Sequence, residues 1–126
     1  MKLWKNSLLF YLGGMLYCGL ELLWRGRTHG SMFLLGGACF LMLGRVGALR
    51  MNVAARAVLG GVLITVGELV VGLLVNRRFQ VWDYRSIPLN FCGQVCLLYS
   101  IFWILLSPVG FLVYRQMARR IGNAAL

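Results

Sequence analysis

The run AVLGGVLITVGELVVGLLVN at residues 57–76 decides the fold, because its twenty residues carry a single charge, on Glu68. An α-helix rises about 1.5 Å per residue, so a run of this length reaches across the roughly 30 Å hydrocarbon core of a bilayer. Three further apolar runs of similar length occupy residues 7–24, 31–49 and 90–114. Isolated strands would leave their backbone unpaired in lipid, and no alternating ten-residue pattern is present. We therefore expect an all-α membrane protein with four transmembrane helices.

The composition leads to the same fold class. Of 126 residues, 60% are apolar and only 13% are charged, too few to cover the surface of a soluble domain of this size. Residues 1–126 are therefore expected to form a single integral membrane domain. The connections at 25–30, 50–56 and 77–89 are short, which makes sequence neighbours antiparallel neighbours in an up-down bundle. Pro108, inside the last run, predicts a local kink or a widened helical turn.

The charge balance is strongly positive, with thirteen Lys and Arg against three Asp and Glu. In a soluble domain this excess would suggest nucleic acid, but here the bases flank apolar runs, where they contact headgroups. We therefore expect the bilayer and anionic lipid as partners, and no nucleic acid. With both termini on one side, that side carries Lys2, Lys5, Arg45, Arg50, Arg56, Arg115, Arg119 and Arg120. The other side carries Arg25, Arg27, Arg77, Arg78 and Arg85. This difference favours cytoplasmic termini, in the cytoplasmic (inner) membrane of a prokaryote.

Small residues form stripes within the expected helices. These are Gly36, Gly44 and Gly47 in the second run, and Gly93, Ser100 and Ser107 in the fourth. Because packing rather than hydrophobicity drives helix association in lipid, such stripes indicate either close contacts within one bundle or the seam of a homodimer. We expect the homodimer.

The first and third runs share a spacing of small and acidic residues. Gly14, Cys18, Glu21 and Arg25 are spaced as Gly61, Thr65, Glu68 and Gly72 are, 47 residues later. The match indicates either two repeated hairpins, related by an axis near the membrane normal, or chance similarity between glycine-rich apolar helices.

Glu21 and Glu68 are the most informative residues, because each is an acid inside a membrane-spanning run. A carboxylate there costs about 2.5–3.5 kcal/mol on insertion scales, so it normally faces the bundle interior or a wet cavity and has a function. With cytoplasmic termini, both acids lie in the outer half of the membrane. We predict that they share a polar pocket there.

Other polar and aromatic side chains are expected at the same level. Arg25 lies one helical turn from Glu21, and Asn90 and Gln94, four residues apart, begin the fourth run. The connection between the third and fourth runs contributes Trp82, Asp83 and Tyr84. The predicted ligand-binding set is therefore Glu21, Arg25, Glu68, Trp82, Asp83, Tyr84, Asn90 and Gln94. A second interpretation is that arginine and amide side chains satisfy the two acids and only hold the bundle together.

Catalysis is not expected from this sequence. The single histidine, His29, has no acid spaced to orient it, and no nucleophile–base pair or metal-ligand set is recognisable. The phosphate-binding pattern Gly-x₄-Gly-Lys-Ser/Thr is also missing from the sequence. We therefore predict neither an enzyme nor a bound cofactor or metal.

Several short motifs occur along the chain: the late acid Glu21, Gly67-Glu68-Leu69, Trp82-Asp83-Tyr84, Pro88-Leu89-Asn90 and Gly93-Gln94-Val95. They resemble motifs of the Putative ABC-transporter type IV (CmpB-like) membrane proteins. Gln94 stands where the family has arginine, and the family's Asn-Arg-Gly stretch appears here only as the basic segment 25–29. The resemblance implies a permease-like membrane protein and adds weight to Glu21, Glu68, Trp82, Asp83, Tyr84 and Asn90 as site residues.

The leading functional prediction is a transport-type or permease-type protein whose acidic pocket binds a cationic or polar solute. A non-catalytic lipid-binding or accessory membrane subunit is the alternative. A small multidrug exporter is a third possibility, since those proteins are short four-span dimers with an acid in the first span. The second acid at Glu68 and the Trp-Asp-Tyr segment do not fit that pattern.

Overall fold

The computed structural model describes residues 3–26 and 28–124, apart from the side chains of Arg25, Asn123 and Ala124. Over this part of the chain, α1 spans Leu3–Arg25, α2 Gly30–Gly47, α3 Val53–Val75 and α4 Leu97–Ala124. Two short strands, β1 (Asn90–Phe91) and β2 (Val95–Cys96), precede α4. All four helices are long and apolar enough to cross a membrane, which confirms the predicted fold class. Lys2, Arg27 and the side chain of Arg25, which the sequence assigned to the basic flanks and the site, lie outside the described residues.

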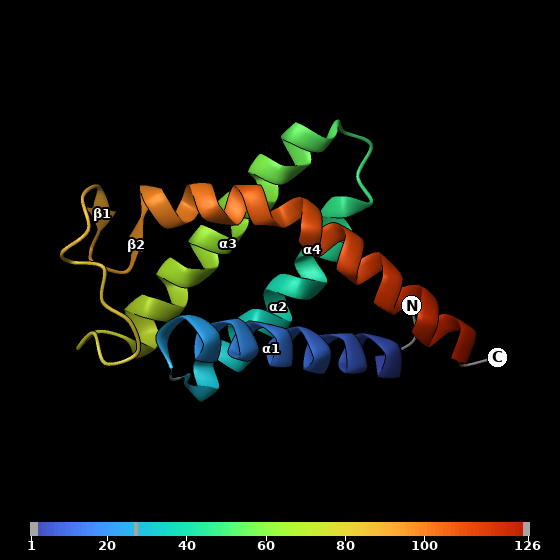
Figure 1. The fold of residues 1–126 in the computed structure, drawn as a ribbon, viewed down its shortest axis with the longest axis horizontal. Helices are drawn as coiled ribbons and strands as arrows, with labels where there is room; N and C mark the ends of the chain where they lie inside the picture. The colour runs from blue at the N-terminus through green and yellow to red at the C-terminus, as the bar shows by residue number, and fades with distance from the viewer. Residues whose placement is uncertain (1–2, 27, 125–126) are drawn as a thin grey trace.

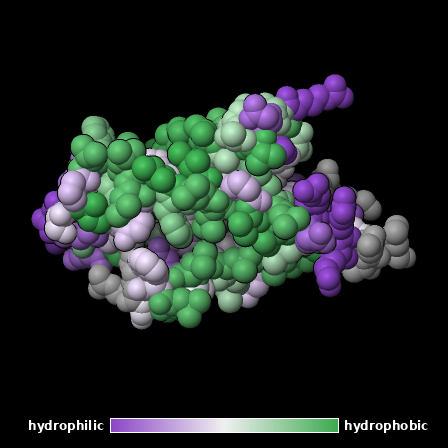
Figure 2. Space-filling view, turned by 45° about the horizontal axis from the view of Figure 1, so that its top comes forward, coloured by the Kyte–Doolittle hydropathy of each residue, from purple (hydrophilic) through white to green (hydrophobic). Residues whose placement is uncertain are grey.

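The helices run back and forth between the same two ends of the molecule (Figure 1). The loop end carries the α1–α2 connection and the segment 76–96, and the terminal end carries both chain termini and the α2–α3 connection. α1 packs on α2, α3 packs on α4, and α2 contacts both members of the second pair. Figure 2 shows a broad hydrophobic belt between two hydrophilic ends. This is the distribution expected of a protein surrounded by acyl chains.

Side-chain caps begin two of the helices. His29 Nδ1 accepts a hydrogen bond from Ser31 N (3.1 Å) at the start of α2, and Asn52 Oδ1 accepts one from Ala55 N (2.8 Å) at the start of α3. Both side chains satisfy helix-end N–H groups that have no partner within the helix. The single histidine, His29, therefore caps the N-terminus of α2.

The predicted small-residue stripes lie at contacts between helices of this one chain, with the exception of Gly93. That glycine is in the segment before α4, has a φ of +67° and faces Arg85 and Phe79 of the same loop. Gly36 faces Tyr17 of α1, and Gly44 and Gly47 face Tyr114 and Phe111 of α4. On α4 itself, the Ser100 hydroxyl accepts a hydrogen bond from Thr65 Oγ1 (2.9 Å), and Ser107 packs against Gly60. These stripes therefore bring the helices of one bundle close together. A homodimer would need other surfaces and stays a prediction.

The sequence-based start of the fourth helix is wrong. Asn90 and Phe91 pair antiparallel with Cys96 and Val95, and α4 begins only at Leu97. The backbone explains this difference, because Leu89, Cys92 and Gly93 have φ values of +58°, +56° and +67°, which end any right-handed helix. Asn90 and Gln94 therefore do not share a helix face.

The remaining helix bounds differ less from the prediction. α1 and α3 each begin four residues earlier than expected, and α4 continues ten residues beyond its predicted end at Tyr114. α4 changes direction near its middle, where Pro108 lacks the N–H that would continue the helical hydrogen bonds (Figure 1). The kink predicted from Pro108 is therefore present.

We expect opposite effects on stability from alanine at two glycines. A Cβ at Gly36 would overlap the Tyr17 side chain, whereas nothing lies within 4 Å of a Cβ at Gly19. Overpacking of this kind costs typically about 1–3 kcal/mol, and replacing an open helical glycine gains up to about 1 kcal/mol. In thermal unfolding of the detergent-solubilised protein, Gly36→Ala should lower the midpoint and Gly19→Ala should not. Equal midpoints for the two variants would contradict the close contact of α1 and α2.

Candidate functional site

Two buried amides fold the segment 76–96 onto the ends of α3 and α4. The Asn76 side chain is fully buried, and its Oδ1 accepts hydrogen bonds from Val81 N (2.8 Å) and Trp82 N (3.3 Å). Its Nδ2 donates to Trp82 O (2.7 Å) and to Gln94 Oε1 (2.9 Å), and Gln94 Nε2 donates to Asn76 O (3.0 Å). Every polar atom of the two amide groups thus has a partner inside this segment. We call these hydrogen bonds of Asn76 and Gln94 the amide network.

Trp82 and Asn90 belong to the same folded segment. The indole Nε1 of Trp82 donates to Gln94 O (2.7 Å), and the Asn90 side chain donates to Ile87 O (2.9 Å) and accepts from Gly93 N (3.0 Å). The polar groups of these two predicted ligand residues, like those of Gln94, therefore hold the loop in shape.

Asp83 lies on the outside of the loop. Its side chain is 41% exposed and pairs with Arg85 Nη2 (2.7 Å), whose guanidinium also lies over the Phe79 ring at 4.1 Å from the centroid. The hydrogen bonds from Arg85 lower the pKa of Asp83 to about 2, and Asp83 in turn raises the pKa of Arg85. The two residues thus form an ion pair on the loop surface, and neither residue lines a cavity described below.

Glu68 lies in the packed interior of the bundle. Its side chain is 2% exposed, and Oε1 accepts a hydrogen bond of 2.5 Å from Trp103 Nε1 on α4. The Trp103 ring also stacks on Tyr17 of α1, with ring centroids 5.8 Å apart. Glu68 thus fixes the orientation of an indole that reaches α1.

Glu21, by contrast, lies on the wall of a cavity of about 350 Å³ near the loop end. Its side chain is 9% exposed. The other lining residues are all aromatic or aliphatic: Tyr17, Leu20, Trp24, Tyr84, Leu98, Tyr99, Phe102, Trp103 and Leu106. Tyr84 and Tyr99 stack on each other with centroids 4.9 Å apart. We call this the aromatic cavity, and Glu21 is the acidic side chain on its wall.

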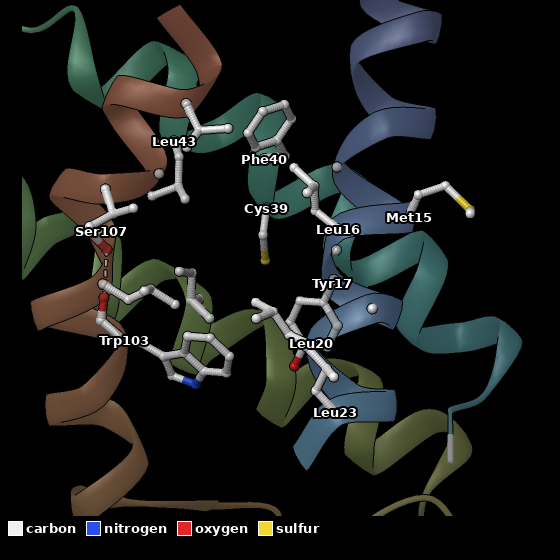
Figure 3. A pocket seen from close by; sticks show the side chains of 18 residues that line it. Met15, Leu16, Tyr17, Leu20, Leu23, Cys39, Phe40, Leu43, Trp103 and Ser107 are labelled. Carbon is white, nitrogen blue, oxygen red and sulfur yellow. Dashed lines mark hydrogen bonds between the residues drawn. The ribbon is translucent and has the colours of Figure 1, made fainter. Parts of the chain in front are cut away.

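A second, more apolar cavity of about 450 Å³ adjoins it between α1, α2 and α4. The two cavities share the lining residues Tyr17, Leu20, Trp103 and Leu106. Figure 3 shows Tyr17 and Leu20 of α1 extending toward Trp103 and Ser107 of α4 across this space. We call this the apolar cavity. Together the two form a space that has an acidic side chain among aromatic rings at one end and mostly aliphatic walls along the rest.

The structure therefore separates the predicted site residues into three groups. Glu21 and Tyr84 line the aromatic cavity. Glu68 does not line it, but accepts a hydrogen bond from Trp103, which does. Trp82, Asn90 and Gln94 hold the loop, and Asp83 is exposed. The Arg25 side chain lies outside the described residues. Tyr17 is related to both acids, because it lines the aromatic cavity with Glu21 and stacks on the Trp103 ring that donates to Glu68.

Sequence reasoning missed the aromatic residues of the helices. Tyr17 precedes Glu21 by four residues, and Trp103 follows Tyr99 by four, so each pair shares a helix face. That spacing was visible in the sequence, although aromatic residues in a transmembrane helix more often face lipid or packing partners. The Tyr17 hydroxyl is buried without a hydrogen-bond partner among the described residues.

The comparisons with known proteins give one finding. The model of the family described as "Putative ABC-transporter type IV" matches residues 8–124 of this chain, which is nearly all of it. No curated protein and no solved structure matches.

The amide network makes a prediction of its own. Asn76→Ala removes the partners of the Val81 and Trp82 backbone and of Gln94, and each unpaired buried group costs about 1–3 kcal/mol. We expect the segment to open and trypsin to cut much faster at Arg77, Arg78 and Arg85 in the folded, solubilised protein. Gln80→Ala, an exposed amide in the same segment, is the matched control. Cleavage of both variants at the wild-type rate would show that the network does not hold the loop.

Proposed function

The chain belongs to the Putative ABC-transporter type IV family, and from that premise we propose a transport-type membrane protein whose aromatic cavity binds an amphipathic organic cation. Family membership and four membrane-spanning helices support the transport class. The solute is proposed from the walls of the cavity.

The observation that carries the proposal is the position of Glu21 among aromatic rings. A carboxylate within a membrane-spanning segment is costly and marks a functional site by default. The faces of Tyr and Trp rings attract cations through their quadrupoles, most strongly where water is excluded. Glu21 and the rings of Tyr17, Tyr99 and Trp103 line one cavity, and this arrangement suits a single positive charge.

The nature of the walls also favours a cation over a neutral polar solute. A sugar or an amino acid carries several hydrogen-bonding groups, and each one buried without a partner costs free energy. The lining residues of the aromatic cavity offer few polar groups besides Glu21. A quaternary ammonium or phosphonium centre needs no hydrogen bonds, so the walls suit it better.

The apolar cavity supports an amphipathic ligand. It adjoins the aromatic cavity at Tyr17 and Trp103 and is lined by aliphatic side chains such as Leu16, Leu43 and Val109. A cationic group beside Glu21 and an apolar tail in the second cavity would fill both spaces. Trp103, which lines both cavities and donates to Glu68, would contact the ligand where its two parts join.

A non-catalytic lipid-binding or accessory subunit is the second candidate. The predominantly apolar lining of both cavities, within membrane-spanning helices, favours it. The sequence carries no phosphate-binding loop, so we assign no nucleotide hydrolysis to this chain. In our proposal the loop end faces away from the cytoplasm, in an inner membrane with both termini cytoplasmic, and the functional unit is a homodimer.

Binding of tetraphenylphosphonium tests the proposed site. In nanodiscs of neutral lipid, Glu21→Gln should weaken binding at least about tenfold, because the amide keeps the size of the side chain but removes its charge. Asp83→Asn removes one carboxylate from the exposed loop and should leave the affinity unchanged. Isothermal titration calorimetry gives both affinities. Equal losses in the two variants, or no binding by the wild-type protein, would refute the cation site.

Flux measurements distinguish the two candidate functions. In liposomes with a gradient of the same cation, the wild-type protein should accelerate equilibration and Glu21→Gln should not. Two results together would favour the accessory subunit. The first is that the wild-type protein binds the cation without flux. The second is that lipid which stays bound to the wild-type protein through detergent exchange is lost from Leu106→Trp, whose larger side chain would block both cavities.

A further inference from the structure

Positive charge at the terminal end has no acidic side chain to balance it. The sequence contains only three acids, Glu21, Glu68 and Asp83. Glu21 is near the last turn of α1, Asp83 is in the loop, and Glu68 is in the half of α3 nearer the loop end. Around the terminal end, the described basic residues are Lys5, Arg45, Arg50, Arg56, Arg115, Arg119 and Arg120. Charges of this number repel one another, and an anion from outside the chain that lay among them would reduce this repulsion.

Three of these arginines line one cavity. It has a volume of about 520 Å³ and lies where the end of α2, the start of α3 and the second half of α4 meet. Arg56, Arg115 and Arg119 line it, together with Tyr114 and Phe111. We call this the arginine cavity. It is a separate space from the two cavities between α1 and α4, with which it shares no lining residue.

Arg56 is held in place and keeps hydrogen-bonding capacity. Its Nη1 donates to Gly47 O (2.5 Å), and its guanidinium lies 5.9 Å from the centroid of the Phe111 ring. Its Nε is buried and has no hydrogen-bond partner among the described residues. A buried N–H of a cation without an acceptor is unfavourable, so an acceptor from outside the chain would satisfy it.

We propose that the arginine cavity binds one phosphate-type oxyanion. Guanidinium groups match the geometry of phosphate oxygens with paired hydrogen bonds, and three of them surround this space. Val53, the first residue of α3, also lines the cavity, so the positive end of that helix adds to the attraction. The phosphate of an anionic lipid headgroup and free phosphate share this chemistry. The proposal does not depend on the cation site near the loop end.

The position of the arginine cavity favours a lipid as the source. Hydrophilic residues gather at the terminal end directly beside the hydrophobic belt, the depth at which headgroups lie (Figure 2). Pro108, Phe111 and Tyr114 give the cavity apolar walls on the side of α4. A phosphate among the arginines and a glycerol backbone against these side chains would fit such a space.

Thermal unfolding with short soluble ligands tests the site. In neutral detergent, dihexanoyl phosphatidylglycerol should raise the unfolding midpoint of the wild-type protein, and dihexanoyl phosphatidylcholine should not, because its headgroup has no net charge. The double variant Arg115→Gln/Arg119→Gln removes two exposed side chains and should weaken the apparent affinity at least about tenfold. Arg77→Gln/Arg78→Gln, which removes two charges at the loop end, is the matched control and should respond as the wild type does.

Inorganic phosphate separates the two sources of the anion. A rise with phosphatidylglycerol alone supports a lipid headgroup, and an equal rise with inorganic phosphate supports a soluble phosphate; both support the site. The proposal is overturned if neither anion raises the midpoint, if phosphatidylcholine raises it equally, or if the Arg115/Arg119 variant responds as the wild type does. An equal loss in the Arg77/Arg78 control would also overturn it, because the effect would then be general electrostatics.

Discussion

The hydrogen bond from Trp103 Nε1 to Glu68 is the interaction on which the centre of this molecule depends. A carboxylate in the membrane interior has no access to bulk water, so the protein must supply its donors. This donor comes from a ring that also stacks on Tyr17 and lines both cavities between α1 and α4. One bond therefore joins α3 to α4, fixes the indole, and shapes the wall opposite Glu21.

The two acids in the membrane-spanning helices, Glu21 and Glu68, have different surroundings. Glu68 is packed among helices and is held by Trp103, whereas Glu21 lies on the wall of a cavity lined mainly by α1 and α4. The loop before α4 closes the aromatic cavity by placing Tyr84 on its wall, and the amide network of Asn76 and Gln94 keeps that loop folded. In this account Glu21 attracts a ligand, Glu68 positions an aromatic ring, and the loop residues hold the shape of the site.

The sequence predicted the class of fold because the bilayer allows few alternatives: long uncharged runs must be helices. It also predicted the family. The cost of an acid in lipid drew attention to Glu21, which the structure places on the wall of a cavity. It failed at Asn90–Cys96, since a left-handed backbone at Leu89 and Cys92 is not visible in an apolar, helix-compatible stretch. It placed Asp83, Asn90 and Gln94 in a ligand site because their polarity is evident, but hydrogen bonds to a nearby backbone or to Arg85 depend on how the loop folds. The sequence did not predict that Tyr17 and Trp103 line the cavities, because this depends on how α1 and α4 pack.

All three acids of the sequence lie toward the loop end and offset part of the positive charge of its five arginines, whereas the bases around the terminal end have no acid near them. The larger net positive charge is therefore at the terminal end, where it suits an anionic headgroup. The central claim is that the aromatic cavity receives an organic cation beside Glu21. A crystal structure with tetraphenylarsonium tests it most directly, through the anomalous signal of arsenic. We expect an anomalous difference peak from arsenic within about 6 Å of the Tyr17 and Trp103 ring centroids and next to the Glu21 carboxylate. A cavity without a peak, with arsenic bound only elsewhere on the protein, would contradict it.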